Sequence, residues 1–244
     1  MYAQNDLSKM NMKGKVKSDT CFYYDVFDQM GKDVLSYRDK EALKFNSIGN
    51  IEEITYFNER NNPTKKIANS YHDKQLYQTD TLFDNAYDSH RALLFYDNIG
   101  RLNQRAIYQS NGMVLRKSFY SYLDNGLLSE IKNYSSNGNY EGYVAYNYEY
   151  HKNGKVAAIY SSEGKLTFDS LGHYIGDMFF KNSEQPDGYK YLYNENGDII
   201  CNEHGQTFQY SYDANGNVTL RIKSELKFEK ITPVERSIHR LHYY

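Results

Sequence analysis

Apolar and polar residues alternate along much of the chain with the two-residue period that is typical of β-strands. Tyr146, Tyr148 and Tyr150 fall on one face of such a segment, as do Phe208 and Tyr210 of another. Successive side chains of a strand point to opposite faces of a sheet, so this alternation favours half-buried strands over helices. The pattern predicts a protein that consists almost entirely of short β-strands.

Asparagine and glycine occupy the gaps between the alternating segments. Six of the sixteen glycines directly follow an asparagine. These asparagines are Asn111, Asn125, Asn137, Asn153, Asn196 and Asn215. Asparagine and glycine tolerate the positive φ that type I′ turns and hairpin loops with a glycine bulge require. Each copy therefore predicts a strand, a tight turn and a second strand.

One frame recurs along the chain: an aromatic residue, about three polar residues, a glycine, a small or charged residue, and an aliphatic residue. It is clearest at 96–102, 122–128, 150–156, 193–199 and 212–218. Such short units favour hairpins that share their strands with their neighbours. We expect an all-β fold, an antiparallel meander of tandem β-hairpins that forms a long twisted or spiralling sheet. Partial closure of that sheet remains open at this stage.

Two copies of the frame resemble the YD repeat of the RHS family. They are Phe95–Leu102 and Tyr210–Val218, in which Tyr-Asp is followed by Gly-Arg-Leu or Gly-Asn-Val. Other copies carry His, Asn or Leu in place of the aspartate, so the resemblance is to a diverged relative. It implies spiralling β-sheets in an exported or cell-surface protein, with a role in carbohydrate binding or in enclosing a toxin.

The frame extends over most of the chain, which predicts a single YD-repeat-like β domain over residues 1–244. The repeat is weakest over 60–91, and a domain boundary, if there is one, would lie there. Pro63 with the two preceding asparagines, and residues 184–188, suggest longer loops. We expect residues 9–17 to open the sheet at one end and residues 223–244 to cap the edge at the other.

Charge and composition narrow the classes of partner. The 29 basic and 31 acidic residues are scattered, which argues against nucleic acid as the partner. With 27 Tyr, 12 Phe and no Trp, the sequence favours a shallow core whose rings bury their faces and keep their hydroxyls wet. No apolar run approaches the roughly 18 residues of a transmembrane helix, so we expect no membrane insertion.

The first residues carry a weak indication of export. Ala3 and Gln4 would suit the pair of residues around a signal-peptidase cut. We therefore expect an exported protein, periplasmic, cell-surface or secreted, whose signal peptide has been removed.

No catalytic, metal-binding or cofactor-binding pattern is present in the sequence. Cys21 and Cys201 are predicted to be unpaired, partly buried thiols, with a long-range disulfide as the alternative, and neither neighbours a plausible catalytic histidine. The histidines lack metal-ligand spacing. Asp97, Asp124 and Asp213 supply one acid per turn, which favours hydrogen bonds within the turn over Ca²⁺ binding. We expect no cofactor, and we expect that the chain is not an enzyme.

The alternating tyrosines along the predicted strands are the feature that suggests a function, since exposed tyrosines stack on sugars and dominate protein interfaces. The candidate ligand-binding aromatics are Tyr146, Tyr148, Tyr150, Tyr191, Tyr193, Tyr210 and Tyr212. The leading hypothesis is an exported, non-enzymatic protein that binds a protein or glycan partner through an aromatic-rich sheet surface. The oligomeric state stays open.

Two alternatives remain beside this hypothesis. One is a purely structural spacer or a remnant of a shell-forming protein, which would bury almost all of its tyrosines. The other is a hydrolase with a cleft near residues 60–90. The acids and histidines of that stretch are His72, Asp73, Asp80, Asp84, Asp88 and His90.

Overall fold

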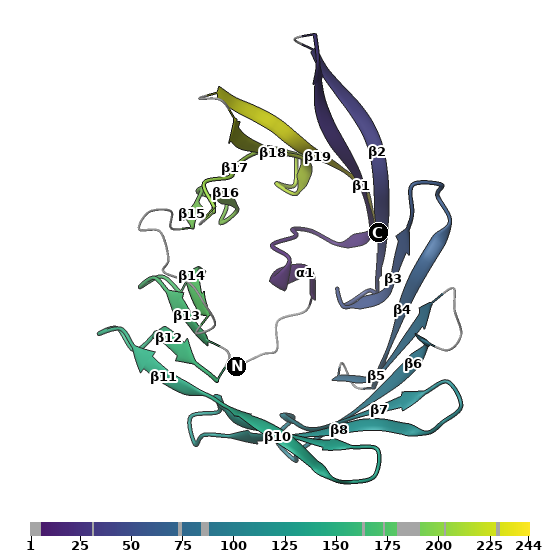
Figure 1. Cartoon of the computed structure of the whole chain (residues 1–244), viewed down its shortest axis with the longest axis vertical. Coiled ribbons are helices and arrows are strands. Elements are labelled where there is room, and N and C mark those ends of the chain that lie inside the picture. Colours follow the sequence, from purple (N-terminus) through teal and green to yellow (C-terminus); the bar gives the residue numbers. More distant parts are fainter. Residues whose placement is uncertain are drawn as a thin grey trace. The chain divides into compact units, whose positions relative to one another are not determined.

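The computed structural model confirms the all-β fold (Figure 1). It describes residues 6–30, 32–72, 75–83, 88–162, 164–172, 174–179, 191–202, 204–227 and 230–244. Almost all of its regular structure is β-strand, and the helix α1 (Asp6–Lys9) is short. In the described part of the chain, no helix is both long and apolar enough to traverse a bilayer.

The chain divides into two compact units. The first contains Met1–Ser89, Tyr193–Ile200 and Gly205–Tyr244, and the second contains His90–Leu192 and Cys201–His204. The division between Ser89 and His90 falls inside the stretch where the repeat of the sequence is weakest.

Ten antiparallel strands pair in and around the first unit in the order β5-β4-β3-β2-β1-β19-β18-β17-β16-β15. Their bounds are β1 (Val16–Gln29), β2 (Lys32–Phe45), β3 (Ile51–Phe57), β4 (Pro63–His72), β5 (Gln75–Phe83), β15 (Leu192–Tyr193), β16 (Ile199–Cys201), β17 (Thr207–Tyr212), β18 (Val218–Lys227) and β19 (Lys230–Tyr243). Consecutive strands are neighbours except where β1 meets β19. The predicted meander is therefore confirmed on each side of that pair.

The pairing of β1 with β19 joins the first and last strands of the chain, which are purple and yellow in Figure 1. β1 lies between β2 and β19, and β19 lies between β1 and β18. The expectation that residues 9–17 and 223–244 lie at opposite ends of the sheet is therefore wrong. Alternation along a strand sets which residues share a face, but it does not specify which strand becomes the neighbour.

Two runs of antiparallel strands belong to the second unit. One has the order β10-β9-β8-β7-β6 and the other has the order β11-β12-β13-β14. Their bounds are β6 (His90–Tyr96), β7 (Leu102–Gln109), β8 (Val114–Tyr122), β9 (Leu128–Ser135), β10 (Tyr140–Ala145), β11 (Asn147–Tyr150), β12 (Val156–Tyr160), β13 (Gly164–Phe168) and β14 (Tyr174–Phe179). In the described part of either unit, no strand order returns to its first strand, so none of these sheets is closed.

The turns use one of the two geometries that the sequence allows. In the Asp97 turn, the N–H of Gly100 donates to the carbonyl oxygen of Asp97 at 3.0 Å, and Gly100 has a φ of 84°. The asparagines before the glycines keep negative φ among the described residues. A three-residue loop with a glycine bulge therefore replaces the type I′ turn. The Oδ1 of Asp97 accepts the N–H groups of Ile99 and Arg101, and that of Asp213 accepts those of Asn215 and Asn217, as predicted for these two acids.

Degenerate copies keep the same turn with a different acceptor. Where Leu123 replaces the aspartate, the Oδ1 of Asn125 accepts the N–H of Leu127 instead. The predicted longer loop before Pro63 is wrong, because Asn61 takes the glycine position with a φ of 62° and Pro63 begins β4 directly. Asparagine is among the few residues that tolerate this conformation. The other predicted loop, at 184–188, lies outside the described residues.

The core of the first unit is small. Leu7, Val16, Leu43 and Phe45 are buried together, and Leu241 packs against them. α1 is attached to this cluster, since the N–H of Leu7 donates to the carbonyl oxygen of Gly49 at 3.0 Å. The segment that follows α1 therefore crosses one face of the sheet, where it forms part of the wall of a pocket.

Candidate ligand pocket in the first unit

A pocket of about 410 Å³ opens on one face of the first unit. The period of two places its polar residues, because Asp19, Cys21 and Tyr23 occupy alternate positions of β1 and face the same side. Across the sheet they are joined by the following residues of the neighbouring strands and segments: Met10, Met12, Glu41, Leu43, Tyr193, Asp198, Tyr210, Arg221, His239 and Leu241. The wall thus combines aromatic, acidic and basic groups.

Three side chains on the pocket wall form a continuous hydrogen-bonded line. The Nδ1 of His239 lies 2.8 Å from Oδ2 of Asp19, and its Nε2 lies 3.4 Å from the Sγ of Cys21. Cys21 is 2% exposed and Asp19 is 1% exposed. The register of β1 and β19 places Cys21 directly opposite His239. An acid on one ring nitrogen and a nucleophilic atom on the other is the arrangement that orients an imidazole in acyl-transfer triads.

The imidazole of His239 is held in its charged form. Burial by itself would lower its pKa, but the hydrogen bonds with Asp19 and Cys21 outweigh burial and raise the pKa to about 10. His239 is therefore an imidazolium at neutral pH. The second carboxylate oxygen of Asp19, Oδ1, is buried and has no hydrogen-bond partner among the described residues.

Further ionisable groups surround the line. Glu41 is the cross-strand partner of Cys21 on β2. Burial raises its pKa, and so does the charge of Asp19. Burial also raises the pKa of the Tyr23 hydroxyl far above its usual range, together with a hydrogen bond with Cys21. On β18, Arg221 donates through Nη2 to Glu235 at 2.7 Å, which fixes the position of its guanidinium.

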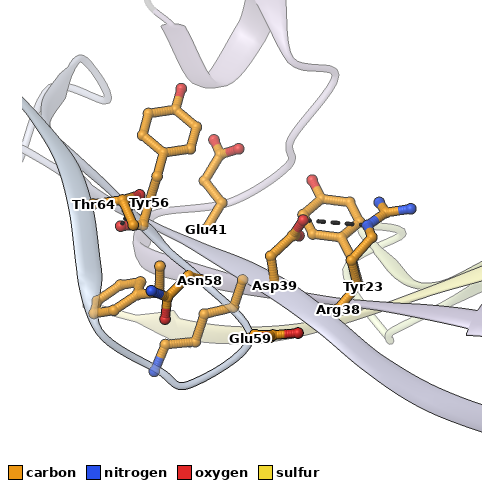
Figure 2. A pocket seen from close by; sticks show the side chains of 10 residues that line it. Tyr23, Arg38, Asp39, Glu41, Tyr56, Asn58, Glu59 and Thr64 are labelled. Atoms are coloured by element: carbon orange, nitrogen blue, oxygen red, sulfur yellow. Dashed lines mark hydrogen bonds and ion pairs between the residues drawn. The ribbon is translucent and has the colours of Figure 1, made fainter.

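A second, shallower pocket of about 510 Å³ adjoins the first, and Tyr23 and Glu41 line both. Figure 2 shows its walls, in which Glu41 and Tyr56 project to the same side of β2 and β3. Arg38 donates through Nε to Asp39 at 3.2 Å, the contact that is dashed in the figure. Its lining from residues 56–59 and 64 reaches the edge of the stretch that was considered for a hydrolase cleft.

Among the described acids and histidines of the stretch 60–90, His72 lies on β4, Asp80 on β5 and His90 on β6. Asp80 accepts a hydrogen bond from Gln78 on its own strand, and His72 lies at the end of β4. Asp73 and Asp84 lie outside the described residues. Over the described part of the chain, no group of three His, Cys, Asp or Glu residues is placed to hold a metal ion.

The seven predicted aromatics are divided between the two units. In the first unit, Tyr193 and Tyr210 line the 410 Å³ pocket. Tyr212 stacks on Tyr210 with 6.2 Å between ring centroids, and its hydroxyl donates to Asp198 at 2.8 Å. The hydroxyl of Tyr210 donates to the carbonyl oxygen of Ile199 at 2.7 Å, and burial raises its pKa to about 12.

The remaining predicted aromatics belong to the second unit. Tyr148 is half-buried and its hydroxyl donates to the carbonyl oxygen of Leu128 at 2.7 Å. Tyr150 is 47% exposed and accepts a hydrogen bond from Asn125. Tyr146 is half-buried, and Tyr191 packs its ring against that of Tyr174 at 5.0 Å. The structure therefore brings only some of the predicted aromatics together.

The contact of Cys21 with His239 was not predicted from the sequence. The prediction that both thiols are unpaired is confirmed, since Cys21 and Cys201 are free. The expectation that neither cysteine neighbours a plausible histidine is wrong for Cys21. The alternation Asp19, Cys21, Tyr23 could have shown a polar face on one strand, but the histidine is 218 positions away in sequence.

Comparison with known proteins gives no family for this chain. No family model matches it, and no curated protein matches it. Among solved structures, a porin-like protein from Bacteroides uniformis is 11% identical with a TM-score of 0.45, over 94% of this chain and 99% of that chain. TcdB2-TccC3 without its hypervariable C-terminal region is 10% identical with a TM-score of 0.31, over 100% of this chain.

The chain spans only 16% of the TcdB2-TccC3 chain that it matches. A protein of unknown function from Bacteroides caccae is 10% identical with a TM-score of 0.17, over 88% of this chain and 98% of that chain. These identities and TM-scores are too low to carry an argument about function. The resemblance to the YD repeat rests on the sequence motif.

Proposed function

We propose that the chain is a binding protein and that it recognises a glycan in the 410 Å³ pocket of the first unit. The observation that carries the proposal is the presence of Tyr193 and Tyr210 in one pocket with Arg221. Tyrosine rings stack on the apolar faces of sugars. Guanidinium and carboxylate groups supply the fixed donors and acceptors that sugar hydroxyls need.

The size and chemistry of the pocket support a small ligand. Its volume lies within the range of about 300–1,000 Å³ that is typical of small-molecule sites. Glu41 and Asp198 add acceptors to its wall beside the donors of Arg221. A sugar unit at the end of a glycan therefore suits this site better than a flat protein surface does. A protein partner remains the second ligand class to test.

The proposal involves binding without turnover, in line with the expectation that the chain is not an enzyme. What supports this is the charge of His239, whose raised pKa of about 10 leaves it protonated at neutral pH. A protonated imidazole can donate a proton but cannot accept one from water, so it does not serve as a general base. Export remains part of the proposal, and fractionation of cells that express the full-length protein tests it.

A glycan array followed by calorimetry with the strongest hit tests the proposal. We expect Tyr193→Ala to weaken binding about tenfold, because an aromatic contact contributes about 0.5–1.5 kcal/mol. Tyr150→Ala is the matched control, since Tyr150 is exposed on the second unit and lies outside the pocket. Equal weakening by both substitutions, or no loss with Tyr193→Ala, would refute the pocket as the site. An array without any hit would refute the glycan as the ligand.

A further inference from the structure

Three features of its surroundings distinguish Cys21 from Cys201. Its sulfur contacts an imidazole, it belongs to the wall of a pocket, and the imidazole is oriented by a buried carboxylate. From this geometry we propose that Cys21 is a nucleophilic thiol that attacks small disulfides in the pocket and retains half of the reagent as a mixed disulfide. This inference is independent of the proposed glycan binding.

The sheet fixes the geometry of the reacting groups. Cys21 faces His239 in the antiparallel ladder of β1 and β19, and β2 pairs with the other edge of β1. Asp19 lies two residues before Cys21 on the same face and holds Nδ1 of the imidazole. Nε2 is thereby directed at the sulfur, 3.4 Å away. The protonated ring can therefore donate a proton to a leaving group at the same place.

Charged groups of both signs line the pocket together with the sulfur. The cations are the imidazolium of His239 on β19 and the guanidinium of Arg221 on β18. The acids are Asp19 on β1 and Glu41 on β2, and burial raises the pKa of Glu41. Burial also raises the pKa of Tyr23, so its hydroxyl stays protonated and can donate a hydrogen bond to the sulfur of Cys21.

The reaction balances without any further reagent. The Cys21 thiolate attacks one sulfur of a disulfide RS–SR, so that a Cys21–SR bond forms and the original S–S bond breaks. The departing RS⁻ takes the proton from Nε2 of His239 and leaves as RSH. His239 ends the step neutral and regains a proton from solvent. The adduct occupies the pocket until another thiol reverses the exchange.

The two cysteines of the chain supply their own control. Cys201 is half-buried, and its sulfur contacts the backbone carbonyl oxygen of Asn202 at 3.6 Å. The Cys201→Ser variant leaves Cys21 as the single thiol, and the Cys21→Ser variant leaves Cys201. Each is treated with hydroxyethyl disulfide, a small neutral reagent, and the mixed disulfide is measured by mass spectrometry as a function of time and pH.

We expect the mixed disulfide to form at least about tenfold faster at Cys21 than at Cys201 near pH 7, because Nε2 of His239 lies beside the sulfur and can protonate the departing thiolate. His239→Gln in the Cys201→Ser background should slow the reaction at Cys21 to the rate found at Cys201. Asp19→Asn, which retains a hydrogen-bond acceptor, should give an intermediate rate. Circular dichroism identifies the variants that fold, and Asp19→Asn provides the test where His239→Gln does not.

Two results would overturn the inference. One is the absence of an adduct at Cys21 in the folded protein under conditions in which the unfolded protein reacts. The other is a rate of adduct formation at Cys21 that is no greater than the rate at Cys201. Neither result bears on glycan binding, which is measured by calorimetry on the unmodified protein, so the two proposals fail separately.

Discussion

Arg38 and Glu235 meet across an intervening strand although they are 197 positions apart in sequence. Arg38 on β2 donates through Nη1 to Oε2 of Glu235 on β19 at 3.1 Å, over the face of β1. The other carboxylate oxygen of Glu235 accepts a hydrogen bond from Arg221 on β18. One carboxylate therefore connects three strands beside the pairing of the first and last strands of the chain.

The substitution Glu235→Gln should destabilise the first unit by about 1 kcal/mol at neutral pH, since Arg38 is partly exposed and solvent weakens the pair. Burial would raise the pKa of Glu235, but the two guanidiniums outweigh it and lower the pKa below its ordinary value of 4.5. The stabilisation is thus present above that value and is lost as the pH falls through the folded pKa. Urea unfolding of both proteins between about pH 7 and pH 3 should show the difference disappear in acid. A constant difference would contradict this reading.

The stabilisation by the hydrogen bond between His239 and Asp19 has the opposite pH dependence. The pKa of His239 is raised from 6.5 to about 10, so the stabilisation is complete below 6.5 and is lost as the pH rises through the folded value. The His239→Gln variant should therefore be less stable than the parent at about pH 6, and this difference in stability should decrease progressively toward pH 10. Thermal unfolding of both proteins over this pH range measures the difference. A difference that increases with pH would show that His239 is neutral in the folded protein.

Gly126 tests the turn geometry without a steric complication. Its φ is 84°, and a Cβ built on it would meet nothing within 4 Å, so the cost of Gly126→Ala is backbone strain. We expect a loss of about 1–2 kcal/mol. Asp124→Ala in the same turn is the control, because Asp124 is exposed and should change stability by less than about 0.5 kcal/mol. Denaturant unfolding that finds the two variants equal would argue against the left-handed glycine.

Asn217 attaches the segment after α1 to the rest of the first unit. Its Oδ1 accepts the N–H of Lys13 at 2.5 Å, and its Nδ2 donates to the carbonyl oxygen of Lys13 and to the hydroxyl of Tyr243. Asn217→Ala removes all three contacts from a buried site, which should cost about 1–3 kcal/mol. Hydrogen exchange should accelerate first at residues 7–13. Uniform acceleration over both units would mean that the segment does not open separately.

Much of the fold could be predicted from local chemistry. Asp97, followed three residues later by Gly100, predicts its own turn, and the alternation of Phe208, Tyr210 and Tyr212 predicts β17. The tight turn at Asn61 was not predicted, because an asparagine occupies the position where a glycine is usual. The segment therefore resembled a longer loop. The physical requirement, a residue that tolerates positive φ, was nevertheless met.

The candidate site could be predicted only in part, because it depends on which strands become neighbours. Tyr193 and Tyr210 were identified from their alternation, although nothing local indicated that they would share a pocket. The contact of Cys21 with His239 follows from the pairing of the first and last strands, which depends on long-range interactions. The spacing of residues in the sequence does not indicate which strands pair.

The central claim is that the pocket of the first unit holds the ligand. Nuclear magnetic resonance of protein with labelled tyrosines, titrated with the strongest glycan from the array, tests it most directly. The claim predicts saturating shifts at Tyr193 and Tyr210, which line the pocket, and none at Tyr148 and Tyr150 of the second unit. Shifts confined to Tyr148 and Tyr150, with Tyr193 and Tyr210 unchanged, would contradict it.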